Sequence, residues 1–205
     1  MRQLLLLITI SWLLLGCATK PINPKAPLIS ANWPEHQAQI EAAQHWQAVG
    51  KLGVKVPNDG GSANLRWQQT LSDYQIDLNG PFGQGKMSIT GSPSKVTLTE
   101  GGNPPQTAKS AEELIRKNTG WTIPVPQLSY WVRGLPAPSS KITRFAPNAQ
   151  GLLGELEQLG WTVTYGDYLS VGDQQLALPG RIQAVFNDIR LTLVIREWTL
   201  EPAHE

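Results

Sequence analysis

The sequence predicts a mainly β fold, in which one curved antiparallel sheet is closed or lined by a few helices. Three observations predict it. Apolar and polar residues alternate with the two-residue period of half-buried strands in two regions, 52–98 and 152–195. Clusters of Gly, Pro, Asn and Asp break these runs and are typical of tight turns between strands that pair with their neighbours. Helical patterns precede the first region and separate it from the second.

Length and composition exclude several classes of protein. A chain of 205 residues is long enough for one sizeable core. Its 40% hydrophobic residues, with eight Trp, are more apolar than a disordered chain would carry. Seventeen basic residues nearly balance sixteen acidic ones and form no long run, which excludes an electrostatic nucleic-acid binder. The one cysteine, Cys17, excludes an internal disulfide and a multi-cysteine metal site.

Residues 1–16 are predicted to be a secretory signal peptide. Arg2 precedes an apolar run at 4–15, which is shorter than the about 20 residues that a membrane-spanning helix needs. The following Leu-Leu-Gly-Cys sequence resembles the lipobox of bacterial lipoproteins, whose cysteine is lipidated and becomes the mature N-terminus. That cysteine is Cys17. The residue after it is Ala18 and not an aspartate, which by the same resemblance favours delivery to the outer membrane.

Residues 17–32 are predicted to form the lipidated N-terminus and a flexible tether. Pro21, Pro24 and Pro27 stand there among small and polar residues. Fully extended, this segment would reach about 50 Å at ~3.3 Å per residue. Two or three acyl chains give a stable membrane anchor, whereas one is marginal. Residues 33–205 are then expected to form a single binding domain.

The folded part is expected to begin with a helix. Pro34 suits its first turn, and residues 35–48 have helix-forming composition. Alternation then predicts an antiparallel meander. Its strands are expected around 52–56, 63–67, 74–78, 87–89 and 96–98.

Two further helices are predicted in the middle of the chain. Ser110 and Glu113 form a capping box, and Gly120 suits the end of a helix at 111–119. A shorter helix is expected at 126–133, where Pro occupies the first turn. Strands are then expected around 152–159, 161–165, 182–186 and 191–195, the last ending near residue 198.

No catalytic or metal-binding pattern emerges. The histidines, His36, His45 and His204, lack metal-ligand spacing, and there is neither a Gly-x-Ser-x-Gly elbow nor a Cys/His pair. Residues 80–86 fit Gly-x-x-x-x-Gly-Lys, but Met87 replaces the Ser/Thr that would bind Mg²⁺, and a strand is predicted where a phosphate-binding loop needs a helix. We therefore expect no enzyme activity, no cofactor and no metal.

The notable features are apolar instead. Phe82 lies between Pro81 and Gly83 in a glycine-rich connection between two strands. It either folds back onto the core or forms an exposed apolar finger, which normally marks contact with a membrane or a partner. Tryptophans in ordered elements have a similar pair of interpretations, as buried core or as the wall of a cavity. They are Trp46, Trp67, Trp131, Trp161 and Trp198.

Several short segments, weak individually, agree in order and spacing with a known family. They are Trp-Gln-Gln-Thr at 67–70, Asn-Gly-Pro-Phe-Gly at 79–83, Ile-Pro at 123–124, Trp-Val-Arg-Gly-Leu-Pro at 131–136 and Trp-Thr-Val-Thr-Tyr-Gly at 161–166. Together with the lipobox, they make the chain resemble the LolB family of outer-membrane lipoprotein receptors over nearly its whole length. That family acts with the periplasmic carrier LolA in lipoprotein sorting.

The resemblance implies an incomplete antiparallel β-barrel covered by helices, with a hydrophobic cavity that accepts the acyl chains of lipoproteins. Tryptophans of the family match Trp67, Trp131 and Trp161, which are therefore the candidates for the cavity wall. Trp46 and Trp198 have less support. Phe82 takes the place of an exposed leucine on the family's protruding loop, where Gly80 lengthens the approach slightly.

The expected function is a non-enzymatic, monomeric receptor, anchored at Cys17 to the periplasmic face of the outer membrane. It would accept lipoproteins from LolA and insert them into that membrane, with Phe82 touching the bilayer. Three acyl chains contain about forty CH₂ groups, so their exposure to water would cost on the order of 30 kcal/mol at ~0.8 kcal/mol each. A lipoprotein that binds another amphiphile or an envelope assembly partner is the alternative. An envelope enzyme is a third class, without a recognisable nucleophile.

Overall fold

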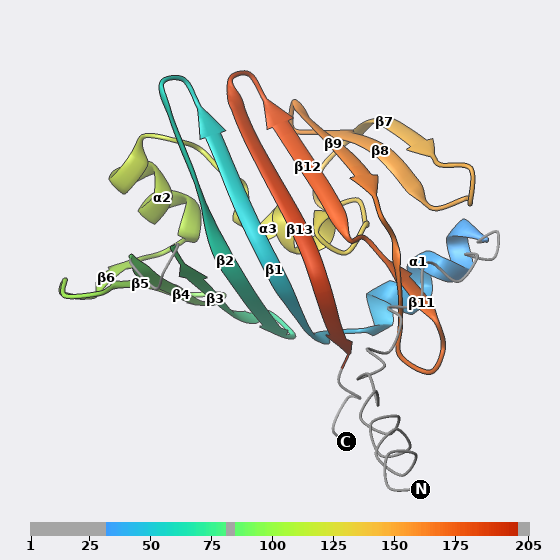
Figure 1. Cartoon of the computed structure of the whole chain (residues 1–205), viewed down its shortest axis with the longest axis horizontal. Helices are drawn as coiled ribbons and strands as arrows, with labels where there is room; N and C mark the ends of the chain where they lie inside the picture. Colours follow the sequence, from blue (N-terminus) through green and yellow to red (C-terminus); the bar gives the residue numbers. More distant parts are fainter. Residues whose placement is uncertain (1–31, 81–84, 201–205) are drawn as a thin grey trace, which may run out of the picture.

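The computed structural model describes residues 32–80 and 85–200. The predicted signal peptide, Cys17 and the tether therefore lie outside the described residues, as do Pro81, Phe82 and Gly83. Within the described part the chain forms three helices and thirteen strands (Figure 1).

One eleven-stranded antiparallel sheet is the frame of the described chain. Its strands lie in the order β6-β5-β4-β3-β2-β1-β13-β12-β9-β8-β7, and β10 and β11 form a separate hairpin. The strands are β1 (His45–Val56), β2 (Asp59–Thr70), β3 (Asp73–Asn79), β4 (Lys86–Ser92), β5 (Lys95–Glu100), β6 (Gln106–Ala108), β7 (Ile142–Pro147), β8 (Leu153–Gln158), β9 (Trp161–Gly166), β10 (Leu169–Val171), β11 (Leu176–Leu178), β12 (Arg181–Phe186) and β13 (Ile189–Leu200).

The pairing of β1 with β13 joins the two halves of the sheet. It runs antiparallel from Trp46 opposite Leu200 to Lys55 opposite Arg190, with a register shift after Val49. Gly50 follows this shift, and a Cβ there would overlap the Val194 carbonyl. The other strands of the large sheet, except β9 with β12, pair with their sequence neighbours, as expected of a meander.

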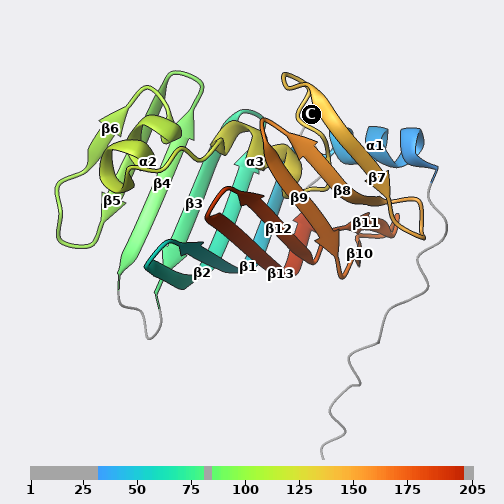
Figure 2. The same cartoon turned by 90° about the horizontal axis from the view of Figure 1, so that it is seen from above.

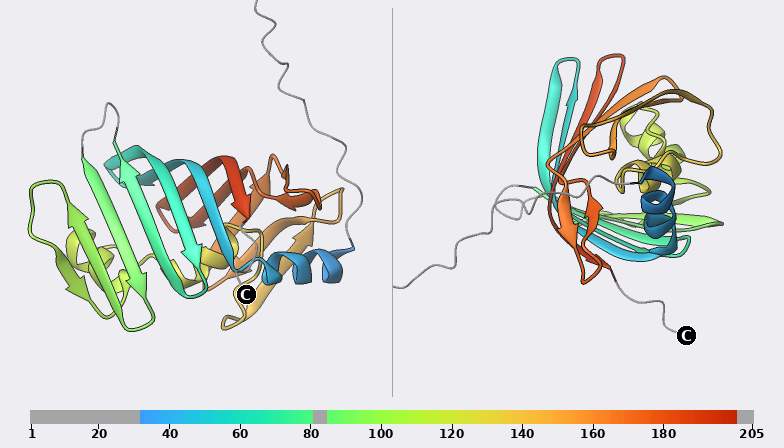
Figure 3. Two further views of the ribbon diagram at one scale, coloured as in Figure 1. Left: turned by 90° about the horizontal axis from the view of Figure 1, so that it is seen from below. Right: turned by 90° about the vertical axis from the view of Figure 1, so that its right-hand side faces the viewer.

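The sheet is strongly curved and open, and the helices lie on its concave side (Figure 2, Figure 3). The helices are α1 (Trp33–Ala42), α2 (Ala111–Thr119) and α3 (Val125–Trp131). The edge strands β6 and β7 stand at opposite ends of the strand order and do not pair with each other. The predicted fold class, an incomplete antiparallel barrel with a helical cover, is confirmed.

The caps of α2 are those that its sequence predicts. The Glu113 backbone N–H donates to the Ser110 hydroxyl at 3.2 Å, which satisfies one of the free N–H groups of the first turn. At the other end Gly120 has a φ of 77°, and its N–H donates to the Arg116 carbonyl at 2.9 Å. Glycine adopts this left-handed conformation without the clash of a Cβ.

The predicted helix at 35–48 is too long. α1 ends at Ala42, and Trp46 and Ala48 belong to β1 instead. Both side chains are buried, and β1 is hydrogen-bonded on both sides, to β2 and to β13. Tertiary pairing therefore overrides the local helix propensity of this segment. Four short strands, β6, β7, β10 and β11, were not predicted at all.

A fully buried glutamine, Gln158, fixes α3 against strand β8 of the sheet. The Oε1 atom of Gln158, on β8, accepts hydrogen bonds from Trp131 Nε1 and from the Ala137 N–H, each at 2.9 Å. Its Nε2 donates to the Ala137 carbonyl at 3.0 Å and to the Ser140 carbonyl at 2.7 Å. One side chain thus satisfies groups from the helix, the segment after it and the sheet.

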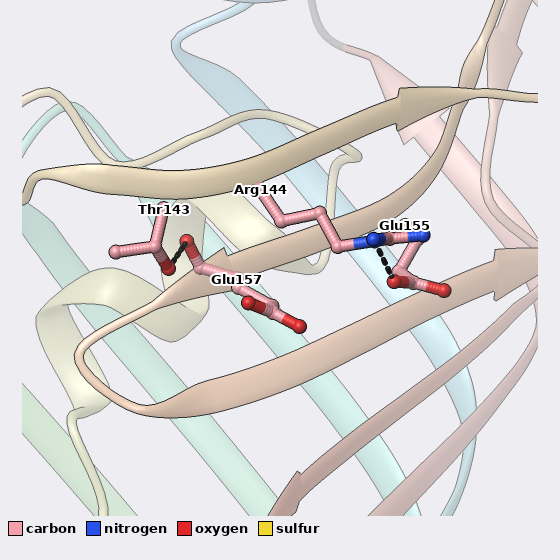
Figure 4. Close-up of polar contacts among 4 residues, drawn as sticks. All are labelled: Thr143, Arg144, Glu155 and Glu157. Carbon is pink, nitrogen blue, oxygen red and sulfur yellow. Dashed lines mark hydrogen bonds and ion pairs between the residues drawn. The ribbon is translucent and has the colours of Figure 1, made fainter.

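The edge strand β7 is held to β8 partly by side chains (Figure 4). The Thr143 hydroxyl donates to the Glu157 carbonyl at 3.0 Å, and Arg144 forms an ion pair with Glu155. The β7–β8 register shifts between Ile142 and Arg144, where the ladder is irregular. The ion pair is solvent-exposed, so its contribution to stability is small.

Candidate functional site

A cavity of about 810 Å³ lies between the concave face of the sheet and the helices α2 and α3. Its volume falls within the range of about 300–1,000 Å³ that is typical of small-molecule sites. Aromatic and aliphatic side chains from strands and helices form much of its wall. They are Trp46, Trp67, Tyr74, Val96, Ala111, Val125 and Tyr130.

Two tryptophans from neighbouring strands form the sheet side of the wall. Trp46 on β1 and Trp67 on β2 lie with ring centroids 5.5 Å apart, and Trp198 on β13 meets Trp46 edge-on at 5.6 Å. The Trp67 Nε1 donates to Gln69 Oε1 at 3.3 Å, whereas the buried Trp46 Nε1 has no hydrogen-bond partner within residues 32–80 and 85–200. Rigid indole rings offer a large apolar contact area to a ligand.

Tyr74 reaches the cavity over a glycine of the next strand. It lies opposite Gly91 in the β3–β4 pair, and a Cβ at position 91 would overlap the tyrosine ring. Burial, together with the nearby charge of Glu112, raises the pKa of Tyr74 to about 12. The phenol is therefore neutral at physiological pH, and the wall carries no charge at this point.

A buried arginine closes the cavity where α1 and α3 approach each other. The Arg133 Nε donates to the Ser129 carbonyl at 3.1 Å, and its Nη1 donates to the carbonyls of Ile40 and Ala43, both at 3.2 Å. Ile40 and Ala43 belong to the end of α1 and its exit. Arg133 thereby donates to carbonyls at a helix C-terminus, where a cation is favourable.

Two aromatic rings flank the same guanidinium. Its Cζ lies 5.6 Å from the Trp46 ring centroid and 5.5 Å from that of Tyr130, within the range of cation–π attraction. Burial lowers the pKa of Arg133, and Tyr130 and Glu41 act in the opposite direction. An arginine at 8% exposure still keeps its charge, so the cavity wall is positively charged at this corner.

The cavity lies at one end of the sheet. Residues 71–72, between β2 and β3, and residues 92–93, at the β4–β5 turn, contribute to its lining. The same strands meet at their other end, where Asn79 pairs with Lys86. Phe82 lies outside the described residues, but its position in the chain is between Asn79 and Lys86. The cavity therefore lies at the end of β3 and β4 that is remote from Asn79 and Lys86.

The three predicted wall tryptophans occupy two different places. Trp67 lines the cavity, whereas Trp131 and Trp161 are not among the described residues that line it. The rings of Trp131 and Trp161 lie 6.2 Å apart, and Trp161 stacks on Phe186 at 5.5 Å. Both tryptophans are buried in the hydrophobic core, Trp131 at the end of α3 and Trp161 at the start of β9.

The sequence interpretation missed two residues of the site, Tyr74 and Arg133, and gave a third, Trp46, less support as a candidate within a predicted helix. The place of Trp46 before an alternating run was a signal for a strand. Tyr74 could have been found from the hairpin register, because it faces a glycine across the strand pair. Arg133 is a lone cation within an apolar segment, which is a signal for a buried, hydrogen-bonded charge.

Metal ligands do not gather anywhere in residues 32–80 and 85–200: no three His, Cys, Asp or Glu side chains are placed to hold an ion. None of the helices in this part of the chain is long and apolar enough to cross a membrane. The cavity described above is largely apolar, which suits it to binding hydrocarbon.

Comparison with known proteins gives one family. The family model described as outer membrane lipoprotein LolB matches residues 44–198. The outer-membrane lipoprotein LolB of Cellvibrio japonicus is 51% identical over 91% of this chain and 91% of its own length. That of Stutzerimonas stutzeri is 38% identical over 91% and 90%. A LolA superfamily protein from Nitrosomonas europaea, of known structure, aligns at 7% identity with a TM-score of 0.48, over 82% of this chain and 94% of its own. The family match and these identities show that the chain belongs to the LolB family of outer-membrane lipoproteins.

Proposed function

We propose that this protein is a receptor anchored in the outer membrane, which accepts lipoproteins from the carrier LolA and inserts them into that membrane. One observation carries the proposal: a chain of the LolB family has a cavity of about 810 Å³ whose wall includes two indole and two phenol rings, those of Trp46, Trp67, Tyr74 and Tyr130. Such a wall fits hydrocarbon chains of varying conformation, because flat rigid rings give apolar area at little entropic cost.

Sheltering the acyl chains is the physical task of the cavity. About forty CH₂ groups in three acyl chains would cost on the order of 30 kcal/mol in water at ~0.8 kcal/mol each. Hydrogen bonds at about 1 kcal/mol apiece could not offset this cost. Transfer without a nucleotide needs only an ordered series of affinities, in which the receptor binds more tightly than the carrier and the bilayer more tightly than the receptor.

The residues divide this task among them. Cys17 carries the acyl anchor, and Phe82 contacts the bilayer when the cargo leaves. Trp67 contacts the acyl chains directly. Trp131 and Trp161 act indirectly, by fixing α3 against the sheet so that the cavity keeps its shape. The domain at 33–205 works as a monomer.

The test is to mix a carrier–lipoprotein complex with the receptor and to measure which protein holds the lipoprotein. We expect transfer to the wild-type protein and at least a tenfold loss with Trp67→Glu, which places a carboxylate in the wall. Trp121→Ala is the control, because Trp121 packs against the core without lining the cavity. Absence of transfer to folded wild-type protein, together with binding of a fluorescent fatty acid, would instead favour a receptor for another amphiphile.

A substitution at the predicted membrane contact separates the late step from the early one. Phe82→Glu should leave the fold and lipoprotein acceptance unchanged, because Asn79 and Lys86, the ends of the strands that flank it in the chain, do not line the cavity. Insertion of accepted lipoprotein into vesicles should be impaired, because a carboxylate resists entering the bilayer. Loss of acceptance with normal insertion of accepted cargo would show that Phe82 does not act at the membrane.

A further inference from the structure

An exposed leucine stands at the rim of the cavity. Leu71, in the turn between β2 and β3, is 60% exposed and lines the cavity. Its φ is 55°, a left-handed conformation that is unfavourable for a bulky side chain. Elsewhere in the described residues Ile142 and Leu159 are the other exposed large hydrophobic side chains, and neither of them lines this cavity.

Hydrogen bonds hold Leu71 in this position. Its N–H donates to the Gln44 carbonyl at 3.0 Å, and its carbonyl accepts from Gln69 Nε2 at 2.8 Å. Gln69 Oε1 in turn accepts from the Trp67 indole at 3.3 Å. The backbone of Leu71 is thus linked, through the Gln69 side chain, to the Trp67 ring of the cavity wall.

The rest of this rim is largely polar. Glu41, Gln44, Ser72 and Ser92 contribute to the lining at the same end of the sheet. A hydrocarbon chain that crosses the rim would pass polar groups and water unless an apolar side chain spans the gap. Leu71 is exposed in the free protein and would be covered by such a chain, which is the favourable direction of apolar burial.

We propose that Leu71 forms the lip over which acyl chains enter the cavity when a lipoprotein is accepted. This inference rests on the proposed function and deepens it. Acceptance then takes place at the cavity end of β3 and β4, and contact with the bilayer takes place at the other end, where Asn79 and Lys86 pair. The two steps use opposite ends of the same strands.

The chain offers a matched control. Leu159, in the turn between β8 and β9, is 51% exposed with a φ of 54° and is not part of the cavity lining. Asparagine is close to leucine in size, is polar and tolerates the left-handed conformation. Leu71→Asn and Leu159→Asn should therefore fold equally well, and they differ only in whether the lost leucine stands at the cavity.

The first experiment measures acceptance from a carrier–lipoprotein complex by the full lipid-anchored protein in phospholipid vesicles. Leu71→Asn should slow acceptance about tenfold, the effect of losing one apolar contact, while Leu159→Asn leaves it unchanged. Insertion of already accepted cargo should be normal in both variants. Equal acceptance by wild type and Leu71→Asn would overturn the inference and leave the proposed function standing. Failure of the wild type itself to accept cargo would overturn both.

A second readout locates the path directly. A bimane fluorophore is attached to a cysteine at one position at a time, in Leu71→Cys, Leu159→Cys or Lys86→Cys; lipidation blocks the thiol of Cys17. Loading with lipoprotein should shift the emission to the blue at position 71 and leave it unchanged at 159 and 86. A shift at position 86 without one at 71 would place the passage at the opposite end and overturn the inference.

Discussion

Replacing Gln158 with leucine should destabilise the protein strongly although the side chain keeps nearly the same volume. Gln158 is 0% exposed, and its amide makes four hydrogen bonds. Two of its partners are backbone groups of Ala137, one is the Trp131 indole, and one is the Ser140 carbonyl. A leucine can make none of these bonds, so the partners lose their acceptor and their donor.

The size of the loss in stability depends on how many hydrogen-bond partners of Gln158 remain buried without access to water. The Trp131 Nε1 and both Ala137 groups are buried with Gln158, whereas the bond to the Ser140 carbonyl is only partly buried and that carbonyl can turn to water. Each buried group without a partner costs about 1–3 kcal/mol. Relief from burying the amide itself offsets part of this sum. We expect the free energy of unfolding to fall by about 3–6 kcal/mol.

Urea denaturation, followed by far-UV circular dichroism, measures this change. Gln75→Leu is the control, because the Gln75 amide is exposed and bonds to Asp77 at 2.9 Å on the surface. Its effect should stay within about 0.5 kcal/mol.

A double-mutant cycle then assigns the loss to the indole bond. In a Trp131→Phe background the Nε1 donor is already absent, so Gln158→Leu should cost about 1–2 kcal/mol less than in the wild type. A cost below about 1 kcal/mol for Gln158→Leu alone, or no coupling with Trp131, would refute the view that this amide fixes α3.

Three other changes test the fold around the cavity. Gly91→Ala should lower the free energy of unfolding by about 1–3 kcal/mol and weaken fatty-acid binding, because the new Cβ displaces the Tyr74 ring. A fluorescence titration measures the binding, and unaltered binding would contradict this expectation. Ser110→Ala should cost about 1 kcal/mol in urea denaturation through the lost α2 cap, and no loss would mean that the cap is dispensable. Burial lowers the pKa of His36. As the pH falls, the unfolded chain therefore takes up a proton at His36 before the folded protein does. The contribution of neutral His36 to the free energy of unfolding should be complete above pH 6.5 and fall as the pH drops below it. Thermal melts from pH 7.5 to 5 should show that fall reduced in His36→Gln, and equal slopes would count against it.

Local signals in the sequence predicted much of the fold. Alternation located most strands of the large sheet, and the Ser110 cap with Gly120 defined α2 at the bounds that the structure has. The joining of β1 to β13 has no local signature, because it pairs residues that are far apart in the chain. The same pairing explains why residues 45–48, which were predicted to be helical, form the start of strand β1.

An apolar binding cavity could be expected from the sequence, but the residues that line it could be predicted only in part. The scattered tryptophans left a buried core and a cavity wall both open, the resemblance to LolB implied the cavity, and Trp67 lies in the wall of the cavity described above. Trp131 has the same residue type and a similar local pattern, but its indole is bonded to Gln158 in the core. Which tryptophan faces a cavity depends on the path of the helices over the sheet, and that path is fixed by contacts such as those of Arg133.

The unpaired edges β6 and β7 have a mechanical consequence. In a closed barrel the number of strands and their stagger determine the diameter, and a wider barrel requires broken ladders. Here no pairing between the first and last strands fixes the curvature of the sheet, since β6 and β7 stand at opposite ends of the strand order. The sheet can uncurl slightly around bulky contents while every backbone hydrogen bond between its strands is kept. Such compliance would let one receptor hold cargoes whose hydrocarbon volumes differ.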